Sequence, residues 1–420
     1  MRVLWTSLVE FPPLAKYLGK EFPAHCGWLY SSAVSALKQM HDLKLGVLVY
    51  SPISNFEHHS VEGIDYYLIP CAKISKVSKR QIESCFLAIK DFQPDLIHIH
   101  GTEHSLAAAV CQANRSKIPM VANIQGLAVP YTRYADGGIP LIDKLVNITP
   151  LDFYRRTFML NAKRSFKRRS ECERLCIQSV GHIIGRTQWD YDHTVTINPG
   201  IQYHFMNETL RDSFYDGARW VYENCRKHSI FVSNSGSPLK GAHNMLLALK
   251  IILQQFPDTV VRFCGSSVMN NDFKSLIKMQ GYHLYLRRLV RKLGLESNVE
   301  FLGSLSERQM KQAFLDANVY VLPSAIENSP NSLCEAQILG VPAVAAYVGG
   351  VPSLVKDGET GFLYRYEETE MLAQIIMRLF RQTDLSELSN KERLSAAERH
   401  DKTNNAFQLA GIYCQILQGC

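Results

Sequence analysis

Two glutamates around a predicted helix start form the part of the sequence best suited to chemistry. The apolar run Val319–Leu322 predicts a buried strand, and Ser329 and Pro330 suit the N-cap and the first position of the helix that follows. The free backbone N–H groups at a helix start attract phosphate. Glu327 precedes the cap. Glu335 lies inside the helix, about 7 Å along the axis from the helix start. A diphosphate bound at this helix start would therefore have a carboxylate on each side.

Two interpretations of this spacing stay open. In the first, Glu327 binds hydroxyl groups of a sugar on one phosphate, and Glu335 accepts hydrogen bonds from a ribose on the other phosphate. In the second, both glutamates are solvated side chains around an ordinary capped helix.

A loop of small residues with one lysine lies between the first strand and the first helix expected in the second half of the chain. It reads Gly236-Ser-Pro-Leu-Lys240-Gly241. Small residues let a ligand approach the backbone, and Lys240 supplies a cation for phosphate. The loop is not a Walker loop, because the Gly-Lys-Ser/Thr ending is missing. The alternative is a surface lysine that precedes a helix.

Two positions in the first half also face the expected ligand. His98 and His100 end the predicted strand Asp95–Gly101 with their side chains on one face, and His100 is nearer the carboxyl end. We interpret His98 as a packed core residue and His100 as a ligand contact. Cys26-Gly27 opens the first helix, where Gly27 is either a point of close approach to a ligand or a turn glycine. No G-x-G-x-x-G follows the first strand, which argues against a dinucleotide-binding oxidoreductase.

Seven basic residues lie in a stretch of fifteen positions that holds no carboxylate, inside a predicted long helix, Asp152–Ser179. One interpretation is a solvated helix face. The other is attraction to anionic headgroups or to an acceptor that carries pyrophosphate. The seven residues are Arg155, Arg156, Lys163, Arg164, Lys167, Arg168 and Arg169.

We expect no metal site and no cofactor. Asp190 and Asp192 have the spacing of a metal-binding D-x-D, but no strand leads into them, so we interpret the match as coincidence. The helix start near Pro330 and Lys240 would supply fixed positive charge in place of a metal ion.

The composition describes a globular protein with two or three domains. The chain has 420 residues, of which 46% are hydrophobic and 20% charged, which argues against disorder and against a collagen-like fibre. The net charge of +7 does not by itself imply nucleic acid binding. Eleven cysteines without a Cys-x-x-Cys pair indicate reduced thiols in a cytosolic protein. The short apolar stretch Val3–Val9 is unlike a signal peptide, and the uncharged run Ala336–Val355 is interrupted by glycine and proline.

Short apolar runs alternate with helical patterns in two series, which predicts an α/β protein with two doubly wound, Rossmann-like domains that face each other across a cleft. We expect an N-terminal acceptor domain over 1–195, a linker over 196–227, a donor domain over 228–395, and a C-terminal helix over 396–420 that packs back on the first domain. The predicted strands are Arg2–Leu8, Lys44–Ser51, Tyr66–Pro70, Asp95–Gly101, Met120–Gly126, His182–Thr187, Ser229–Asn234, Val260–Gly265, Val299–Gly303, Val319–Pro323 and Val341–Val348.

As a set, these motifs resemble the donor half of family 4 retaining glycosyltransferases of the GT-B fold. The resemblance rests on Glu327 with Glu335, Lys240-Gly241, Leu339-Gly340-Val-Pro342, Gly349-Gly350-Val-Pro352 and Asp357-Gly-Glu-Thr-Gly361-Phe-Leu, and covers most of Ser229–Arg381. The first half matches more loosely, at Cys26-Gly27 and at Pro94-Asp-Leu-Ile-His-Ile-His100. Within the family the chain is similar to bacterial enzymes that build capsular or exopolysaccharide repeat units.

The resemblance implies a role for each matching residue. Glu335 would bind ribose hydroxyls, Lys240 the diphosphate and Glu327 the donor sugar. His100 would contact that sugar near the reaction centre. The implied catalytic residues are Glu327, His100 and Lys240, and the implied donor-binding residues are Glu335, Lys240, Ser329, Asn331, Ser332, Gly27 and Gly350.

The chain departs from the family's pattern at the phosphate site. The family usually has an arginine five or six residues before the lysine, where this chain has Ser235 and Asn234. We consider Arg186 as a substitute cation.

The function predicted from these residues is transfer of a sugar from a UDP- or GDP-sugar to a hydroxyl of a glycan or lipid-linked glycan, with the anomeric configuration retained and without a metal. The protein would act in the cytoplasm in cell-surface polysaccharide synthesis, with a peripheral position on the inner face of the cytoplasmic membrane as a further expectation. Nucleic acid is not an expected partner. The alternatives are a nucleotide-sugar epimerase of the same fold and a non-catalytic sugar-nucleotide-binding subunit.

Overall fold

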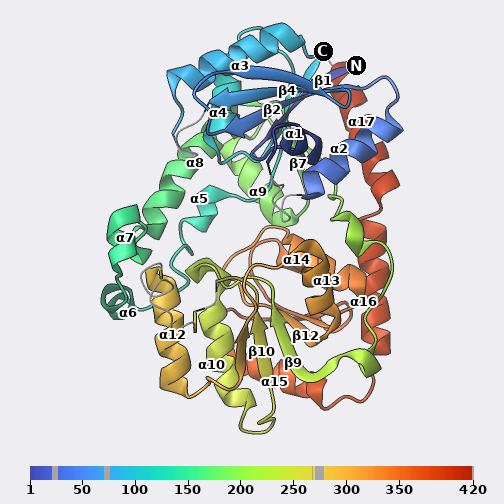
Figure 1. Cartoon of the computed structure of the whole chain (residues 1–420). Coiled ribbons are helices and arrows are strands. Elements are labelled where there is room, and N and C mark those ends of the chain that lie inside the picture. The colour runs from blue at the N-terminus through green and yellow to red at the C-terminus, as the bar shows by residue number, and fades with distance from the viewer. Residues whose placement is uncertain (21–26, 71–75, 267, 270–278, 419–420) are drawn as a thin grey trace. The chain divides into compact units, whose positions relative to one another are not determined.

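The computed structural model describes residues 1–20, 27–70, 76–266, 268–269 and 279–418. They form two compact units (Figure 1). Unit 1 comprises Met1–Pro130, Ser165–Asp212 and His400–Cys420, and unit 2 comprises Tyr131–Arg164 and Ser213–Arg399. The chain therefore crosses between the units four times, instead of once within 196–227. The predicted domain 1–195 is not continuous, because 131–164 belongs to unit 2.

Unit 1 is built on an eight-stranded sheet of order β3-β4-β2-β1-β5-β6-β7-β8. All neighbours are parallel except β3 and β4, which are antiparallel and are joined at Glu62 and Gly63, both with positive φ. The central strands are buried on both faces, as expected for a parallel sheet covered by helices. The sequence did not reveal β3, which is largely exposed, or β8, which lies in the predicted linker. The strands are β1 (Arg2–Ser7), β2 (Lys44–Ser51), β3 (Glu57–Val61), β4 (Ile64–Pro70), β5 (Leu96–His100), β6 (Met120–Asn123), β7 (His182–Gly185) and β8 (Gln202–Phe205).

Helices cover both faces of this sheet. On one face α3, α4 and α8 pack on a core that includes Leu4, Phe92 and Cys176. On the other face α1, α2 and α17 pack on a core that includes Trp5, Leu29 and Tyr413. The helices are α1 (Pro12–Tyr17), α2 (Gly27–Gln39), α3 (Lys79–Phe92), α4 (Ser105–Ala113), α5 (Ala128–Tyr131), α8 (Ala162–Ser179), α9 (Gln188–Ile197) and α17 (Lys402–Gln418).

Unit 2 is built on a fully parallel six-stranded sheet of order β11-β10-β9-β12-β13-β14. From β9 the chain proceeds outward to β10 and β11, and then returns to the other side of β9 with β12. The ends of β9 and β12 are therefore the topological switch point at which such sheets bind ligands. The strands are β9 (Arg226–Val232), β10 (Val260–Phe263), β11 (Val299–Phe301), β12 (Ala317–Leu322), β13 (Ala343–Ala346) and β14 (Phe362–Tyr364), of which β14 was not predicted.

Helices alternate with the strands from β9 to β13, whereas α6 and α7 come from the segment 131–164. The sequence pattern also predicts a helix over 273–293. The structure describes this helix from Gly281 onward, and 273–278 lie outside the described residues. The helices are α6 (Leu141–Val146), α7 (Pro150–Arg155), α10 (Ala242–Ile252), α12 (Gly281–Leu293), α13 (Glu307–Leu315), α14 (Asn331–Leu339), α15 (Thr369–Phe380) and α16 (Ser386–Arg399).

The predicted long helix Asp152–Ser179 is wrong. Thr149 and Asp152 form a capping box that starts α7 at Pro150, and Arg156 ends this helix in the left-handed conformation with φ 55°. A 3-10 helix over Met159–Asn161 then leads into α8. The left-handed residue Arg156 and the 3-10 turn after it therefore interrupt what the basic pattern alone suggested was one continuous helix.

No described helix has both the length and the apolar character needed to cross a membrane.

Candidate active site

The two charged residues singled out beside the expected phosphate meet at the switch point of unit 2. Lys240 follows β9 and Glu327 follows β12, and the Lys240 Nζ atom lies 2.6 Å from the Glu327 Oε1 atom. The Glu327 side chain is 8% exposed and the Lys240 side chain 28%. A partly buried ion pair of this kind has both a cation and an anion ready for a ligand at the carboxyl end of the sheet.

Backbone contacts hold the two loops together. The Ala325 N–H donates to the Leu239 carbonyl oxygen over 2.8 Å. Gly241 has φ 67°, and a Cβ atom there would lie closer than 3.0 Å to the Pro323 carbonyl oxygen. Only glycine suits both the conformation and the space, so the glycine after Lys240 fixes how closely the loops approach.

Helix α14 spans Asn331–Leu339, and its cap differs from the predicted one. Pro330 is the N-cap, with φ −71° and ψ 116°, and its carbonyl oxygen accepts from the N–H groups of Leu333 and Cys334. The predicted cap at Ser329 and first turn at Pro330 are therefore wrong, because the extended ψ of Pro330 keeps it outside the helix. No side chain caps this end, and Asn331 and Ser332 open the first turn. This helix start keeps the polarity that favours an anion.

Tyr320 ties the first turn of α14 to the sheet. Its hydroxyl donates to the Ser332 Oγ atom over 2.9 Å and lies 3.0 Å from the Ser233 Oγ atom. Burial is the main cause that raises the pKa of the Tyr320 phenol, and the carboxylates of Glu327 and Glu335 raise this pKa further. The phenol therefore stays protonated, and both glutamates lie within electrostatic range of it. Glu335 itself is buried in α14.

The glycine pair after β13 supports the Glu327 loop. Gly349 has φ 52°, and a Cβ atom there would lie closer than 3.0 Å to the Glu327 carbonyl oxygen. The Gly350 N–H donates to the same oxygen over 3.0 Å. The Gly350 amide, which we expected to line the donor site, thus has a role in holding Glu327 in place.

A cavity of about 650 Å³ adjoins this loop in unit 2. Ala325, Tyr347 and Tyr366 line it, at the ends of β12, β13 and β14. Its volume falls in the range of small-molecule sites. Tyr347 is 61% exposed and no sequence motif marked it, although its place directly after a strand end was a usable signal.

In unit 1, His100 is a buried imidazole without a hydrogen-bond partner. Neither of its ring nitrogens has one among the described residues, and its backbone N–H donates to the Thr6 Oγ1 atom over 2.8 Å. Burial, and then His98, lower the pKa of His100 well below the usual value for histidine, so the ring is neutral. A neutral imidazole can donate one hydrogen bond and accept another.

His98 is a core residue, as expected. Its Nδ1 atom lies 2.6 Å from the Tyr413 hydroxyl, which in turn accepts from the Trp5 indole over 2.9 Å. Burial lowers the pKa of His98 to about 3. The ring centroids of His98 and His100 are 4.0 Å apart, so the helix α17 positions His100 through His98.

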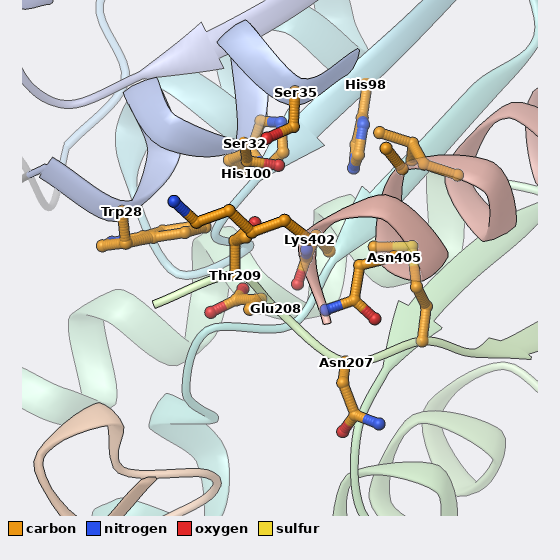
Figure 2. Close-up of a pocket in the computed structure, with 14 residues that line it drawn as sticks. Trp28, Ser32, Ser35, His98, His100, Asn207, Glu208, Thr209, Lys402 and Asn405 are labelled. Atoms are coloured by element: carbon orange, nitrogen blue, oxygen red, sulfur yellow. The ribbon is translucent and has the colours of Figure 1, made fainter. Parts of the chain in front are cut away.

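Two cavities meet at His100. Figure 2 shows the first, into which His98 and His100 project from β5, Trp28 from α2 and Asn405 from α17. Its free volume of about 10 Å³ is that of one water molecule. The second has about 290 Å³ and is lined by Trp28, His100, His104 and Gln125, among others. His104 and Gln125 follow the ends of β5 and β6, a position from which the sequence could have predicted them.

The remaining predicted positions differ in outcome. Gly27 is the first residue of α2, while its neighbour Cys26 lies outside the described residues. Arg186 is buried and pairs with Glu208 over 2.6 Å, so its charge is already balanced and the proposed substitution for a second cation is not supported. Ser235, which replaces the family's arginine, is fully buried, and its hydroxyl donates to the Cys264 carbonyl oxygen over 3.0 Å.

Asp190 has a structural role. Its carboxylate is buried and accepts from the Arg186 N–H and from the Tyr203 hydroxyl. Within the described ranges, no group of three or more His, Cys, Asp or Glu residues could hold a metal ion.

The predicted basic stretch does not form one face. Arg155 to Arg164 belong to unit 2 and Lys167 to Arg169 to unit 1. Lys163 pairs with Asp136 over 3.2 Å, and Arg169 pairs with Glu103 over 2.9 Å.

Comparison with known proteins finds a family match in the second half of the chain. Residues 223–399 match the family described as Glycosyl transferases group 1. This segment is similar to that family. The matched segment contains Lys240, Glu327 and Glu335, so the ion pair and the buried glutamate lie inside it.

The curated relatives are glycosyltransferases too. A D-inositol 3-phosphate glycosyltransferase of Streptomyces scabiei is 30% identical over 238 residues, which cover 56% of this chain and 52% of that protein. A sulfoquinovosyl transferase of Arabidopsis thaliana is 25% identical over 164 residues, which cover 38% of this chain and 29% of that protein. The chain spans about half the length of the D-inositol 3-phosphate glycosyltransferase.

Solved structures confirm the fold. The sucrose-phosphate synthase of Thermosynechococcus elongatus has a TM-score of 0.68 at 15% identity, over 100% of both chains. The Anabaena protein HepE in complex with UDP-glucose has a TM-score of 0.68 at 17% identity, over 99% of this chain and 100% of that one. The predicted architecture of two Rossmann-like α/β domains, the GT-B fold, is therefore confirmed.

Proposed function

We propose that this protein is a retaining glycosyltransferase that transfers a sugar from a nucleotide diphosphate sugar to a hydroxyl group of a glycan or lipid-linked glycan. The observation that carries the proposal is the ion pair between Lys240 and Glu327 at the switch point of unit 2, beside the start of α14. A cation, a carboxylate and a helix start converge there, which are the groups that a sugar diphosphate needs.

The donor would bind by exchange of partners at this ion pair. The diphosphate takes Lys240 and the backbone N–H groups of Asn331 and Ser332. Glu327 then accepts hydrogen bonds from the donor sugar, and Glu335 from the ribose. UDP is the expected nucleotide, because HepE, a protein with the same fold, binds UDP-glucose.

Transfer requires stabilisation of the departing diphosphate. Lys240 and the polarity of α14 supply fixed positive charge where negative charge develops, without reorganisation during the reaction. In the front-face route that the family resemblance implies, the leaving phosphate oxygen accepts the acceptor's proton while the acceptor oxygen bonds to the same face of the sugar. The neutral imidazole of His100 is proposed to hydrogen-bond the donor sugar.

The acceptor and the location are also part of the proposal. We expect a role in cell-surface polysaccharide synthesis in the cytoplasm, at the inner face of the membrane. The D-inositol 3-phosphate glycosyltransferases among the relatives add a small phosphorylated polyol as a second class of acceptor.

A donor screen with product analysis tests the function. Thermal unfolding is measured with UDP-, GDP- and ADP-sugars, and a ligand at 100 times its Kd should add about 2.7 kcal/mol of stability. The stabilising donor is then incubated with and without acceptors, and the anomeric signals are followed by nuclear magnetic resonance. A new α- or β-glycoside of the donor's own configuration supports the proposal. Conversion of the donor alone identifies an epimerase, and binding without any turnover identifies a non-catalytic subunit.

A further inference from the structure

The segment 131–164 of unit 2 exposes an unusual share of large apolar side chains. Nineteen such side chains are exposed among the described residues, and eight of them lie between 134 and 160. Six come from two short helices, α6 and α7, and we name them the α6–α7 patch. The patch consists of Leu141 (62% exposed), Ile142 (65%), Leu145 (48%), Val146 (52%), Phe153 (67%) and Tyr154 (87%).

Three polar residues between and within these helices are buried instead. Asn147, Thr149 and Asp152 are each 5% exposed or less. Asp152 accepts from Thr149 in the capping box, and Arg288 of α12 donates to the Val146 carbonyl oxygen over 2.7 Å. Figure 1 shows α6 beside α12. Polar contacts thus help to hold the segment on unit 2, while the side chains of the patch are exposed. Such an arrangement is typical of a surface that binds something apolar.

Positive charge accompanies the apolar side chains. The segment has six basic and three acidic residues. Lys144 and Lys163 pair with Asp136, whereas no ion pair is formed within the described ranges by the remaining basic residues, Arg133, Arg155, Arg156 and Arg164. Of the three acidic residues in the segment, Asp136 is paired with lysines and Asp152 is buried, which leaves Asp143. The surface therefore combines apolar side chains with unpaired arginines.

We propose that the α6–α7 patch binds an anionic lipid bilayer, with its apolar side chains in the headgroup region and Arg155, Arg156 and Arg164 on lipid phosphates. Apolar side chains beside basic ones are the composition of interfacial membrane anchors. A second copy of the chain fits this surface less well, because its arginines would face those of the first copy. The inference rests on the peripheral membrane location given under the proposed function, and it names the surface that contacts the membrane. That surface replaces the basic stretch 155–169, which is divided between the two units.

Sedimentation with vesicles tests the inference without donor or acceptor, so its result is independent of whether the protein transfers sugar. The full chain is mixed with vesicles of phosphatidylcholine alone or with about 30 mol% phosphatidylglycerol, at about 0.1 M NaCl. We expect sedimentation with the anionic vesicles only. Phe153→Ser with Tyr154→Ser should lower the partition coefficient at least about tenfold. Arg155→Gln with Arg156→Gln and Arg164→Gln should lower it by about fivefold per charge at most.

Matched variants serve as controls. Leu394→Ser with Phe407→Ser removes two apolar side chains that are exposed elsewhere, and Lys250→Gln with Lys292→Gln and Arg308→Gln removes three exposed charges. Both should sediment like the wild type. Equal losses in the controls, or wild-type protein that stays in solution with anionic vesicles, would overturn the inference. A wild-type dimer that Phe153→Ser with Tyr154→Ser converts to a monomer, without vesicle binding, would assign the patch to self-association instead.

A fluorescent reporter gives a second measurement. Tyr154 is 87% exposed, so Tyr154→Trp introduces an indole without disturbing the packing. Its emission should shift to shorter wavelength with anionic vesicles, relative to the same titration of the wild type. An unchanged spectrum at a vesicle concentration where the protein sediments would exclude insertion of the patch.

Discussion

The ammonium group of Lys240 and the carboxylate of Glu327 are 2.6 Å apart, although the two residues lie 87 positions apart in the chain. Each is the other's partner, and the loops that carry them are joined by the bond from the Ala325 N–H to the Leu239 carbonyl oxygen. The pair keeps an anionic and a cationic group close together in a partly buried place. A diphosphate can then take the cation while the carboxylate turns to sugar hydroxyls, with no net change in the number of charged contacts.

Lys240→Ala should lower kcat/KM at least about 100-fold, because the developing charge on the leaving diphosphate loses its fixed cation. Steady-state transfer assays measure this effect, and circular dichroism checks the fold. Lys250→Ala removes an exposed lysine of α10 and should leave transfer unchanged. Wild-type transfer by Lys240→Ala with the true donor and acceptor would show that Lys240 is not part of the site.

Glu335→Gln should weaken donor binding by about 10- to 100-fold if this buried carboxylate accepts from ribose hydroxyls. The specific readout is discrimination between a UDP-sugar and its 2′,3′-dideoxyribose analogue, which the variant should largely lose. Glu370→Gln, at an exposed position in α15, is the control and should keep the wild-type ratio. A variant that binds both donors more weakly but preserves their ratio would indicate a structural role for Glu335.

Gly349→Ala should displace the Glu327 loop, because the added Cβ atom cannot lie where the Glu327 carbonyl oxygen is. We expect a loss of at least about 2 kcal/mol in the free energy of unfolding, together with loss of transfer. Gly358→Ala separates the two causes, since Gly358 also has positive φ, at 77°, but a Cβ atom there would have nothing within 4 Å. That variant should lose about 1 kcal/mol from backbone strain alone. Urea unfolding measures the stability of both variants. Equal losses in the two variants would contradict the close approach of Gly349 to the Glu327 carbonyl oxygen.

Acid should remove the contribution of His98 to stability. Burial lowers the pKa of His98 to about 3 in the folded protein, below the value of about 6.5 for the unfolded chain. The unfolded chain therefore binds the proton first, and folded stability falls as the pH drops below about 6.5. The wild type should have a higher free energy of unfolding than His98→Asn, and we expect this difference to decrease by up to about 1.4 kcal/mol per pH unit from pH 6 to pH 4. Urea unfolding of both proteins across this range provides the test, and a constant difference would mean that His98 does not titrate.

The alternation of apolar runs and helical patterns was enough to predict the fold class. Strands such as β5 and β12 are short, mostly apolar runs that are buried on both faces, so their type and position follow from local sequence. The same regularity placed Lys240, Glu327 and His100 at strand ends, where parallel sheets carry their ligands. These predictions depend on periodicity, which a short window of sequence contains.

Other features depend on contacts between distant segments, which no local pattern specifies. The N-cap of α14 is Pro330 and not Ser329, because the extended ψ angle of Pro330 keeps that residue outside the helix. The predicted basic helix ends at Arg156, which adopts the left-handed conformation, and Arg186 is paired with Glu208 from a different segment. The exposed apolar face of α6 reads in sequence like an ordinary core helix. This face is exposed in the structure, where Arg288 of α12 contacts the polar groups at Val146 and Asn147. Local sequence does not determine this outcome, because burial depends on how the whole chain packs.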